Sequence, residues 1–579
     1  MRLKEWQKIV LLIVICFVIA GFFYTLLFRG LGGKSVTIGE NSFLELTIAG
    51  EVPERAPRDP IKEMLGEGVF TSLQDLLFAV RKAKTDDRIK GIILRPVALL
   101  MGWAKTDEFR DALRDFKISG KPIYAFLEAA SDREYYLATI ADTILAPATG
   151  MLFVNGFAGQ PTFYKETLEK IGVKADFVAH KQYKTAPQEY TRGSMSPESR
   201  EVLNEILDQY FDAYIDTLAN ARQIDAQTVR SLIDQGLFSM QSAFQHGLLD
   251  TLMYEQEFKD HLKKQFDEKP EFVSLSRYQK TSNPKTAPSA KQTVAVIFGS
   301  GMIVNGGEAL YRQGDLVTSG GMAKAIRSAA DDEDIKAIIL RLDSPGGSGS
   351  ASDIIWREVV EARKKKPVFA SVSDMAASGG YYIAMAADTI IAPPNSLVGS
   401  IGIYAGKFSW KDLYEKIGIK KETIKRGRNA DFFSETRPFT PEQRQILSDF
   451  LLEFYQDFVR KVAAGRGMTP EQVEKIAKGR VWTGLAGKKN GLVDVLGNFD
   501  TAIRITKERL GVPADEKIRL MMYPRLESYF ERLFGGRFPL KMTELLPAFK
   551  NVPPGFRSLA RAIPYLQAGE PLYLYPYNF

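Results

Sequence analysis

Ser378 stands in a sequence context that can make a hydroxyl group reactive. It follows the apolar run VFASVSD, which predicts a strand, and it precedes a helical pattern that begins at Gly379. At a strand-to-helix turn the hydroxyl is held at the edge of the sheet, beside free N–H groups and the positive end of the helix dipole. The segment is consistent with a serine nucleophile, and also with a plain helix N-cap.

A serine nucleophile needs a base, and the order of residues along the chain limits the choice. The three histidines, His180, His246 and His261, all precede Ser378, which excludes the α/β-hydrolase order. Chymotrypsin-like and subtilisin-like orders survive only formally, because no histidine lies in a supporting motif. A lysine base fits the sequence better.

The segment AHKQYKTAPQEYTRGSMSP offers two lysines, Lys181 and Lys184. A free lysine titrates near pH 10.4, so a lysine that acts as a base near neutral pH needs a pKa lowered by about 3 units, or roughly 4 kcal/mol. Burial at a domain or subunit interface can supply a shift of this size. A solvated surface lysine is the structural alternative at Lys184.

The chain contains an internal duplication. LLFAVRKAKTDDRIKGIILR, ending at Arg95, aligns with MAKAIRSAADDEDIKAIILR, ending at Arg341, and YYLATIADTILAP aligns with YYIAMAADTIIAP at the same offset, 341 − 95 = 246. Such self-similarity predicts two domains of one fold. The predicted organisation is a first repeat at 42–262, a polar, proline-bearing linker at 263–292, a second repeat at 293–505 and a C-terminal extension at 506–579.

The two repeats differ where the candidate chemistry lies. The second reads RLDSPGGSG where the first reads RPVALLMGW, so only the second has Gly346 and Gly347 after the predicted strand. Glycines there allow a sharp turn and present bare N–H groups. The first repeat has DRE at the position of Ser378, whereas the second has Ala430 or its neighbours where the first has its two lysines. The halves are complementary, because one keeps the hydroxyl and the other the amine.

Within each repeat, short β-branched apolar runs such as TVAVIF and AIILRL alternate with helical stretches such as SASDIIWREVVEARKK. This alternation indicates βαβ units and predicts an α/β fold with mostly parallel sheets. Each repeat also has one long amphipathic helix, near Pro197 and near Pro441, which opens with a Ser or Thr cap followed by proline and glutamate.

The amino terminus predicts a membrane anchor. Residues 9–28, IVLLIVICFVIAGFFYTLLF, carry no charge, and a helix of this length reaches about 30 Å, enough to cross a bilayer. Basic residues in the preceding stub, 1–8, place that stub in the cytoplasm and everything after Arg29 outside. A cleaved signal peptide is the competing interpretation, but RGLGGKS is a poor match to a cleavage site.

Composition excludes several classes of protein. The 579 residues include 77 basic and 70 acidic side chains, and the surplus of +7 is too small to predict nucleic-acid binding. The single cysteine, Cys16, excludes an intramolecular disulfide and a cysteine metal cluster. No motif predicts a metal or an organic cofactor.

The anchor, the duplication and the motifs YKTAPQEY, DSPGGSG, ASGGYY and GSIGI together resemble the long, tandem-repeat form of the signal peptide peptidase A family. Its members are membrane-anchored Ser/Lys serine peptidases related in fold to the ClpP/crotonase superfamily. The resemblance runs from residue 9 to about 505. It implies the following roles: Ser378 as nucleophile, Lys184 rather than Lys181 as general base, Ser400 of GSIGI as the group that orients the amine, and Gly347 and Gly379 as oxyanion donors.

The resemblance also implies an activity and a location. Members degrade cleaved signal peptides and other unfolded hydrophobic polypeptides through an acyl-enzyme, without a cofactor, and assemble as a bowl-shaped homotetramer. The expected place is the plasma membrane of a bacterium, with the catalytic domains on the periplasmic or extracytoplasmic side. A crotonase-like acyl-CoA enzyme and a non-catalytic membrane scaffold stay open as alternatives, as does a dyad formed between protomers.

Overall fold

The computed structural model describes residues 37–56, 71–266, 269–281, 292–311, 316–526 and 572–573. The predicted stub at 1–8 and the predicted transmembrane helix at 9–28 lie outside the described residues. Across the ranges that are described, no helix is both long and apolar enough to cross a membrane.

The first repeat is built around a six-stranded sheet whose strands all run parallel, in the order β10-β1-β2-β3-β5-β9. The strands of this repeat are β1 (Ser42–Glu51), β2 (Ile89–Leu100), β3 (Ile123–Phe126), β4 (Ala129–Ala130), β5 (Thr143–Ala146), β6 (Met151–Val154), β7 (Lys174–His180), β8 (Gly236–Ser239), β9 (Thr251–Leu252) and β10 (Glu271–Ser274). The helices are α3 (Leu73–Thr85), α4 (Trp103–Lys117), α5 (Asp132–Ala138), α6 (Lys165–Ile171), α7 (Gln188–Thr191), α8 (Pro197–Arg222), α9 (Ala226–Gln235), α10 (Met240–Gln245), α11 (Glu255–Lys264) and α12 (Leu275–Gln279).

The second repeat has the same plan in an eight-stranded sheet along β20-β18-β16-β14-β11-β22, with β17 paired to β16 and β21 paired to β17. All its pairs are parallel except β18 with β20. The strands are β11 (Thr293–Ser300), β12 (Met302–Val304), β13 (Leu316–Thr318), β14 (Ile335–Ser344), β15 (Gly347–Ser348), β16 (Val368–Ala377), β17 (Thr389–Ala392), β18 (Leu397–Gly399), β19 (Ile403–Ser409), β20 (Val481–Thr483), β21 (Val495–Leu496), β22 (Arg519–Tyr523) and β23 (Leu572–Tyr573). The helices are α13 (Glu308–Tyr311), α14 (Ser319–Asp331), α15 (Gly349–Arg363), α16 (Gly379–Ala384), α17 (Lys411–Lys416), α18 (Pro441–Arg466), α19 (Pro470–Ile476), α20 (Gly484–Lys489) and α21 (Phe499–Leu510).

Helices cover both faces of the second sheet. In β11, Ala295 and Ile297 enter one core with residues of α14 and α15, whereas Val294, Val296 and Phe298 enter another with residues of α21. Successive strand residues point to opposite faces, so a strand that is apolar at every position is one buried on both sides. The prediction of an α/β fold with mostly parallel sheets is confirmed.

The two long helices begin at the predicted caps. At the start of α8 the side chain of Ser196 accepts a hydrogen bond from a backbone N–H three residues on, and Thr440 does the same for α18; a proline lies in the first turn of each. The helices end at Gln223 and Gly467, whose left-handed backbone closes the last turn. The same kind of capping residue, followed by proline, thus begins the equivalent long helix in both repeats.

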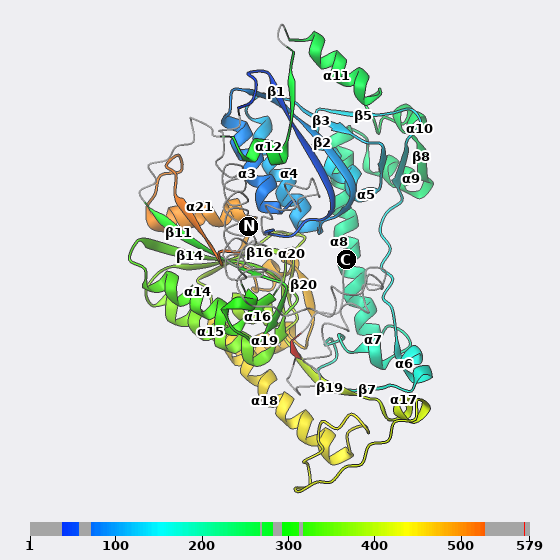
Figure 1. The fold of residues 1–579 in the computed structure, drawn as a ribbon, viewed down its shortest axis with the longest axis vertical. Coiled ribbons are helices and arrows are strands. Elements are labelled where there is room, and N and C mark those ends of the chain that lie inside the picture. The colour runs from blue at the N-terminus through cyan, green and yellow to red at the C-terminus, as the bar shows by residue number, and fades with distance from the viewer. Residues whose placement is uncertain are drawn as a thin grey trace, which may run out of the picture.

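A mixed sheet, in the order β13-β12-β15-β23-β19-β7, joins the repeats. Strand β7 belongs to the first repeat and pairs antiparallel with β19 of the second, from Ile403 opposite His180 to Ser409 opposite Lys174. Figure 1 shows α6 and β7, in cyan, reaching down beside β19 and α17, well below the main sheet of their own repeat. A smaller sheet, β4-β6-β8, completes the first repeat.

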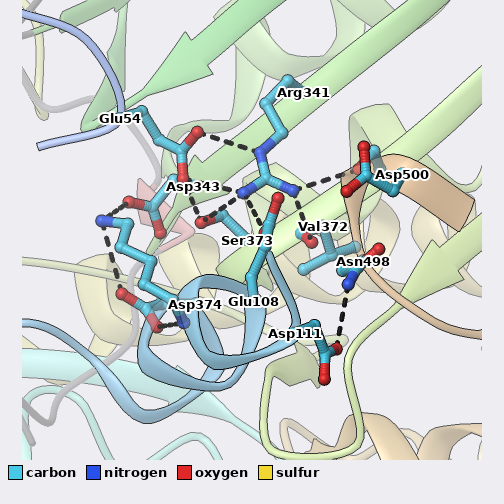
Figure 2. Close-up of polar contacts among 12 residues, drawn as sticks. Glu54, Glu108, Asp111, Arg341, Asp343, Val372, Ser373, Asp374, Asn498 and Asp500 are labelled. Atoms are coloured by element: carbon cyan, nitrogen blue, oxygen red, sulfur yellow. Dashed lines mark hydrogen bonds and ion pairs between the residues drawn. The ribbon is translucent and has the colours of Figure 1, made fainter. Parts of the chain in front are cut away.

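Buried charges also join the repeats. Arg341 in β14 lies between two carboxylates of the first repeat (Figure 2): its Nε donates to Glu54 Oε2 at 2.9 Å and its Nη2 to Glu108 Oε2 at 2.7 Å. Burial raises the pKa of Glu108 to about 6; at Glu54 burial acts in the same sense, but Arg341 outweighs it and the pKa falls to about 2. Removing one partner would leave an uncompensated buried charge, so the cluster fixes the relative placement of the repeats.

Two predicted boundaries differ from the structure. Residues 271–274, in the predicted linker, form β10, which pairs with β1 of the first sheet. Residues 519–523, in the predicted extension, form β22, which pairs with β11 in the corresponding place. Each repeat therefore continues to an edge strand. Comparison of the two halves missed these strands because EFVS and RLMMY share a position in the sheet, held by main-chain hydrogen bonds, without sharing a sequence.

Candidate active site

Ser378 lies at the turn between β16 and α16 and is completely buried. Its backbone has φ 55° and ψ −112°, a conformation that costs free energy in a residue other than glycine, and its N–H donates to the carbonyl of Gly399 at 2.7 Å. The side chain makes no capping hydrogen bond to α16. The N-cap alternative therefore does not explain the hydroxyl.

Lys184 of the first repeat meets Ser378 of the second within one chain. The Nζ atom of Lys184 is 2.6 Å from Ser378 Oγ and 3.0 Å from Ser400 Oγ, and it donates to the carbonyl of Ser400 at 3.2 Å. This is the hydrogen-bond reach that a nucleophile and its base require. The amine is held on two sides by hydroxyl groups.

The turn after β7 places Lys184. The chain turns at Lys181 (φ 77°), and the N–H of Tyr183 donates to the carbonyl of Lys478 at 3.0 Å. Gly479 lies against the next residue, because a Cβ there would come within 2.4 Å of the Lys184 nitrogen. The second repeat therefore contacts the first-repeat backbone at Tyr183 and at Lys184 itself.

Burial governs the protonation of this lysine. Lys184 is 2% exposed, and desolvation alone lowers its pKa well below the ordinary 10.5. No carboxylate contributes to the shift. Because water no longer solvates the ammonium form, the neutral amine is favoured, and only the neutral amine can accept a proton. The site meets the demand that the sequence placed on a lysine base.

The other candidate bases lie elsewhere. Lys181 forms an ion pair with Glu474 at 2.9 Å, with about a third of its side chain exposed. His180 packs against Tyr455, while His246 and His261 bond to neighbours on their own helices. The structure brings Lys184, the lysine that the family resemblance implies, to the serine, and not Lys181.

The SPGG and ASGG segments pack against each other. A Cβ at Gly379 would lie 3.3 Å from Gly346 Cα, and a Cβ at Gly380 would lie 2.8 Å from the carbonyl oxygen of Ser344. Gly347 has φ 154°, and a Cβ there would lie 1.9 Å from the carbonyl oxygen of Ile303. Only glycine fits these approaches. The backbones of Gly347 and Gly379 are thereby placed at the end of the sheet that carries Ser378.

Ser400 is the third side chain at the amine. It is buried, has φ 53°, and its N–H donates to the carbonyl of Arg480 at 2.7 Å. Its hydroxyl restricts where the Lys184 amine can point.

We expect Ser400→Ala to lower kcat for a peptide substrate by about 10²-fold, because a small displacement of a base from its reactive geometry costs this much. Ser400→Gly, which relieves the positive φ but also lacks the hydroxyl, is expected to show the same loss. Steady-state kinetics measure both. Wild-type kcat in either variant would contradict an orienting role.

Backbone strain gathers around the site. Among the described residues, six other than glycine have positive φ, and four of them, Lys181, Ser378, Ser400 and Lys478, lie beside the candidate dyad. Strained conformations persist where surrounding structure imposes them and often mark functional sites. Lys478 and Gly479 were not predicted from the sequence, where their signal is the KGR segment ahead of β20.

The corresponding place in the first repeat is filled by fold-supporting contacts. Asp132, at the position of Ser378, accepts hydrogen bonds from the N–H groups of Asn155 and Gly156, and Glu134 accepts one from Leu99. The first repeat thus keeps the fold, but a carboxylate stands in the place of the Ser378 hydroxyl, and the hydroxyl of Ser131, one position earlier, donates to Glu134.

Strands β15 and β19 flank the site with room for one extended segment between them. The described residues Leu572 and Tyr573 form β23 there, antiparallel to both neighbours, with Tyr573 opposite Gly347 and Leu572 opposite Tyr404. The space between β15 and β19 therefore accepts a polypeptide in strand conformation.

The sequence matches the family model "Peptidase family S49" twice, over residues 115–269 and 361–513. The chain belongs to peptidase family S49. It is a serine protease, and the two matches correspond to the two repeats. The resemblance to a long, two-domain signal peptide peptidase A is confirmed.

Individual relatives agree with this assignment. The chain is 33% identical over 505 residues to "Serine protease SPPA, chloroplastic" of Arabidopsis thaliana, covering 86% of this chain and 74% of that protein. It is 35% identical over 533 residues to "Protease 4" of Salmonella typhi, covering 86% and 84%. A shorter relative, "Putative signal peptide peptidase SppA" of Enterococcus faecium, is 30% identical over 221 residues, covering 38% of this chain and 64% of that protein.

Proposed function

We propose that this chain is a serine endopeptidase with a Ser/Lys dyad, in which Ser378 is the nucleophile and Lys184 the general base. The observation that carries the proposal is the 2.6 Å between Lys184 Nζ and Ser378 Oγ in a buried site. Ser400 orients the amine, and the N–H groups of Gly347 and Gly379 stabilise the oxyanion.

The proposed reaction is acyl transfer. Neutral Lys184 accepts the hydroxyl proton while Ser378 Oγ attacks the carbonyl carbon of the scissile peptide bond. The oxyanion that forms accepts hydrogen bonds from the two glycine N–H groups, each typically worth about 10²–10³ in rate. Lys184 then passes the proton to the leaving amine, the C–N bond breaks, and an acyl-enzyme remains. A water molecule then gives a proton to the same amine and attacks the ester carbonyl carbon. The bond between that carbon and Ser378 Oγ breaks, Lys184 returns the proton to Oγ, and the acid product leaves and ionises.

A fluorophosphonate probe tests this assignment on the full-length chain. We expect stoichiometric labelling at Ser378, because the probe reacts with an activated serine hydroxyl, and no labelling of Ser378→Ala. A crotonase-like acyl-CoA enzyme or a non-catalytic scaffold would leave Ser378 unlabelled. Peptide mapping of the modified residue distinguishes these outcomes.

The substrates we propose are extended, unfolded and hydrophobic polypeptides, including cleaved signal peptides. The support is the space between β15 and β19, because an extended peptide there forms main-chain hydrogen bonds with both strands. A folded protein does not present an extended segment that can form them. A substrate strand in this place and residues 572–573 exclude each other. The Enterococcus faecium relative carries the name of a signal peptide peptidase, which agrees with this substrate class.

We also propose that copies assemble head to tail, and the repeats supply the argument. Helix α8 buries Val202 and Ile206 in one core with residues of the second repeat. The residues 244 positions later on α18 are Ile446 and Phe450, each 43% exposed. The face that joins the two repeats within the chain is therefore left uncovered on the second long helix.

The strands that pack against α8 show the reverse difference in exposure between the two repeats. Leu397 and Val481 of the second repeat are buried in the same core as the α8 residues. Their counterparts in the first repeat are Met151 and Leu237, which are 46% and 54% exposed. An α18 of one copy would cover these residues of the next, and a head-to-tail contact forms a ring where its rotation closes. A homotetramer is the form that the family resemblance implies.

We expect Phe450→Asp and Leu237→Asp each to reduce the mass of the assembly, because either change places a charge in the proposed contact. Light scattering coupled to size-exclusion chromatography measures the mass. Ile118→Asp, at an exposed isoleucine away from both faces, serves as the matched control. An unchanged mass in both contact variants would rule out this interface.

The domain plan and the location stay proposals as well. We propose one membrane-spanning helix at residues 9–28 in a bacterial plasma membrane, with both repeats on the extracytoplasmic side, supported by the apolar run and its basic flank. The ClpP/crotonase likeness of each repeat stays a prediction.

A further inference from the structure

Strand β14 departs from regular pairing beside the candidate site. Leu342 lies opposite Val372, and Ser344 lies opposite Ala376. The single residue Asp343 on β14 therefore faces three residues on β16. This is a bulge, and a bulge re-aims the residues that follow it.

The bulge lies close in sequence to both segments of the candidate site, the turn at Ser378 and the SPGG loop. On β16 it runs from Ser373 to Met375, three positions before Ser378. On β14 it comprises Asp343, four positions before Gly347. The bulge therefore lies just before both the turn that carries Ser378 and the SPGG loop.

Lys105 of the first repeat bridges the bulge. Its Nζ donates to Asp343 Oδ2 at 2.6 Å and lies 3.3 Å from Asp374 Oδ2, and its backbone N–H donates to Asp374 Oδ1 at 3.0 Å. Asp343 Oδ1 in turn accepts a hydrogen bond from the N–H of Met375 at 3.3 Å. The start of α4 presses closely on this group, because a Cβ at Gly102 would come within 2.1 Å of the Asp374 carboxylate. One buried ammonium group ties both strands together.

Ser373, the remaining polar side chain of the bulge, also forms a hydrogen bond with the first repeat. Arg341 Nη2 donates to Ser373 Oγ at 3.1 Å, and the Ser373 hydroxyl donates to Glu54. Figure 2 shows Ser373 beside Glu54 and Arg341, with Asp343 and Asp374 on the neighbouring side of the cluster. Two groups of the first repeat therefore brace a bulge that belongs to the second.

The repeat fold itself does not need this bridge. At the position of Asp343 the first repeat has Val97, and the residue 246 positions after Lys105 is Ala351. The charged bridge occurs only where a first-repeat helix meets the strands that lead to Ser378.

We infer that Lys105 is a positioning residue for peptide hydrolysis: by holding Asp343 and Asp374 together it sets the distance between Ser378 and the oxyanion loop. The first repeat would then contribute two lysines to the reaction, one to the dyad and one to the geometry of the oxyanion site. The inference rests on the proposed dyad. Without the ammonium group the two carboxylates repel each other across the bulge, and the loop moves relative to the nucleophile.

The test compares Lys105→Met and Lys105→Arg with wild type, using the full-length chain, a fluorogenic peptide and fluorophosphonate titration of active sites. We expect Lys105→Met to lower kcat per titrated site by about 10²-fold, with KM changed less than about 3-fold. Lys105→Arg keeps the positive charge, so kcat per titrated site should stay within about 10-fold of wild type. The pH at which activity falls should not move, because Lys184 is untouched.

Lys82→Met is the matched control. Lys82 is also a buried first-repeat lysine, and its Nζ donates to the Tyr278 carbonyl at 2.8 Å and to the Thr281 carbonyl at 2.6 Å, remote from the bulge. Its loss should reduce the number of titratable sites through lower stability while leaving kcat per site unchanged. A purely structural role for Lys105 would produce this same pattern and would overturn the inference.

Asp374→Asn is an independent test of the Lys105 bridge if Lys105→Met yields no titratable active sites. It keeps an acceptor for the Lys105 N–H but removes one charge of the bridge, so we expect kcat per site to fall about 10-fold. Wild-type kcat per site in Asp374→Asn would then overturn the inference. Wild-type enzyme that fails to label at Ser378 would instead overturn the proposed dyad, so the two failures are distinguishable.

Discussion

Replacing Ser378 by alanine is expected to lower kcat for a peptide substrate by about 10⁶-fold, the loss seen when a serine peptidase loses its nucleophile. The change removes one buried oxygen atom that contacts Lys184 Nζ at 2.6 Å and makes no helix cap, so the fold should be retained. Steady-state hydrolysis of a fluorogenic peptide by the full-length chain measures the loss.

Ser42→Ala is a suitable control for this experiment. Ser42 is likewise a completely buried serine, and its hydroxyl donates to the carbonyl of Gly39 at 2.7 Å, far from the site. We expect kcat within about 2-fold of wild type, since a single hydrogen bond of this kind affects stability and not chemistry. If Ser378→Ala retained more than a few per cent of wild-type activity, another residue would have to be the nucleophile.

Replacing Lys184 by methionine is expected to lower kcat by about 10⁴-fold or more, because in the proposed mechanism the serine then has no base to accept its proton. Methionine is unbranched and apolar and can occupy the space of the buried lysine side chain. Lys181→Met is the matched control, because that lysine is three residues away and pairs with Glu474 at the surface. We expect Lys181→Met to stay within about 3-fold of wild type. Equal losses in the two variants would contradict the assignment of the base.

The pH dependence of the wild-type enzyme follows from the same lysine. Burial lowers the pKa of Lys184 well below 10.5, and only the neutral amine accepts a proton. Activity should therefore fall as the pH drops through that lowered pKa, and it should be at its plateau well below pH 10.5. The rate of fluorophosphonate labelling against pH measures this limb directly.

Stability should respond to the same substitution with a defined sign. Between the lowered pKa and 10.5, the unfolded chain binds a proton at Lys184 that the folded chain does not, so this residue makes wild-type stability rise with pH. Lys184→Met lacks this pH-dependent contribution to the free energy of unfolding. Its melting temperature relative to wild type should therefore be highest on the acid side of this window and decline as the pH approaches 10.5. A difference independent of pH would mean that the lysine is protonated in the folded state.

Local sequence patterns were sufficient to predict the secondary-structure elements and the duplication. Apolar runs such as those of β11 and β14 predict buried strands because side-chain alternation and burial on both faces are local properties. Ser196 and Thr440 mark helix starts because capping depends on a few neighbouring residues. The contrast between SPGG with ASGG in one half and their absence in the other indicated where chemistry lies.

Tertiary structure decided what depends on residues far apart in the chain. The contact between Lys184 and Ser378 follows from the pairing of β7 with β19 across the repeats; residue type and spacing alone did not separate Lys184 from Lys181, and only the family resemblance favoured Lys184. The edge strands β10 and β22 are held by main-chain hydrogen bonds, which leave little trace in side-chain patterns. The lowered pKa of Lys184 and the bridge of Lys105 to the bulge both arise from burial between the two repeats. Desolvation and charge pairing are properties of the packed interface, and no local stretch of sequence encodes them.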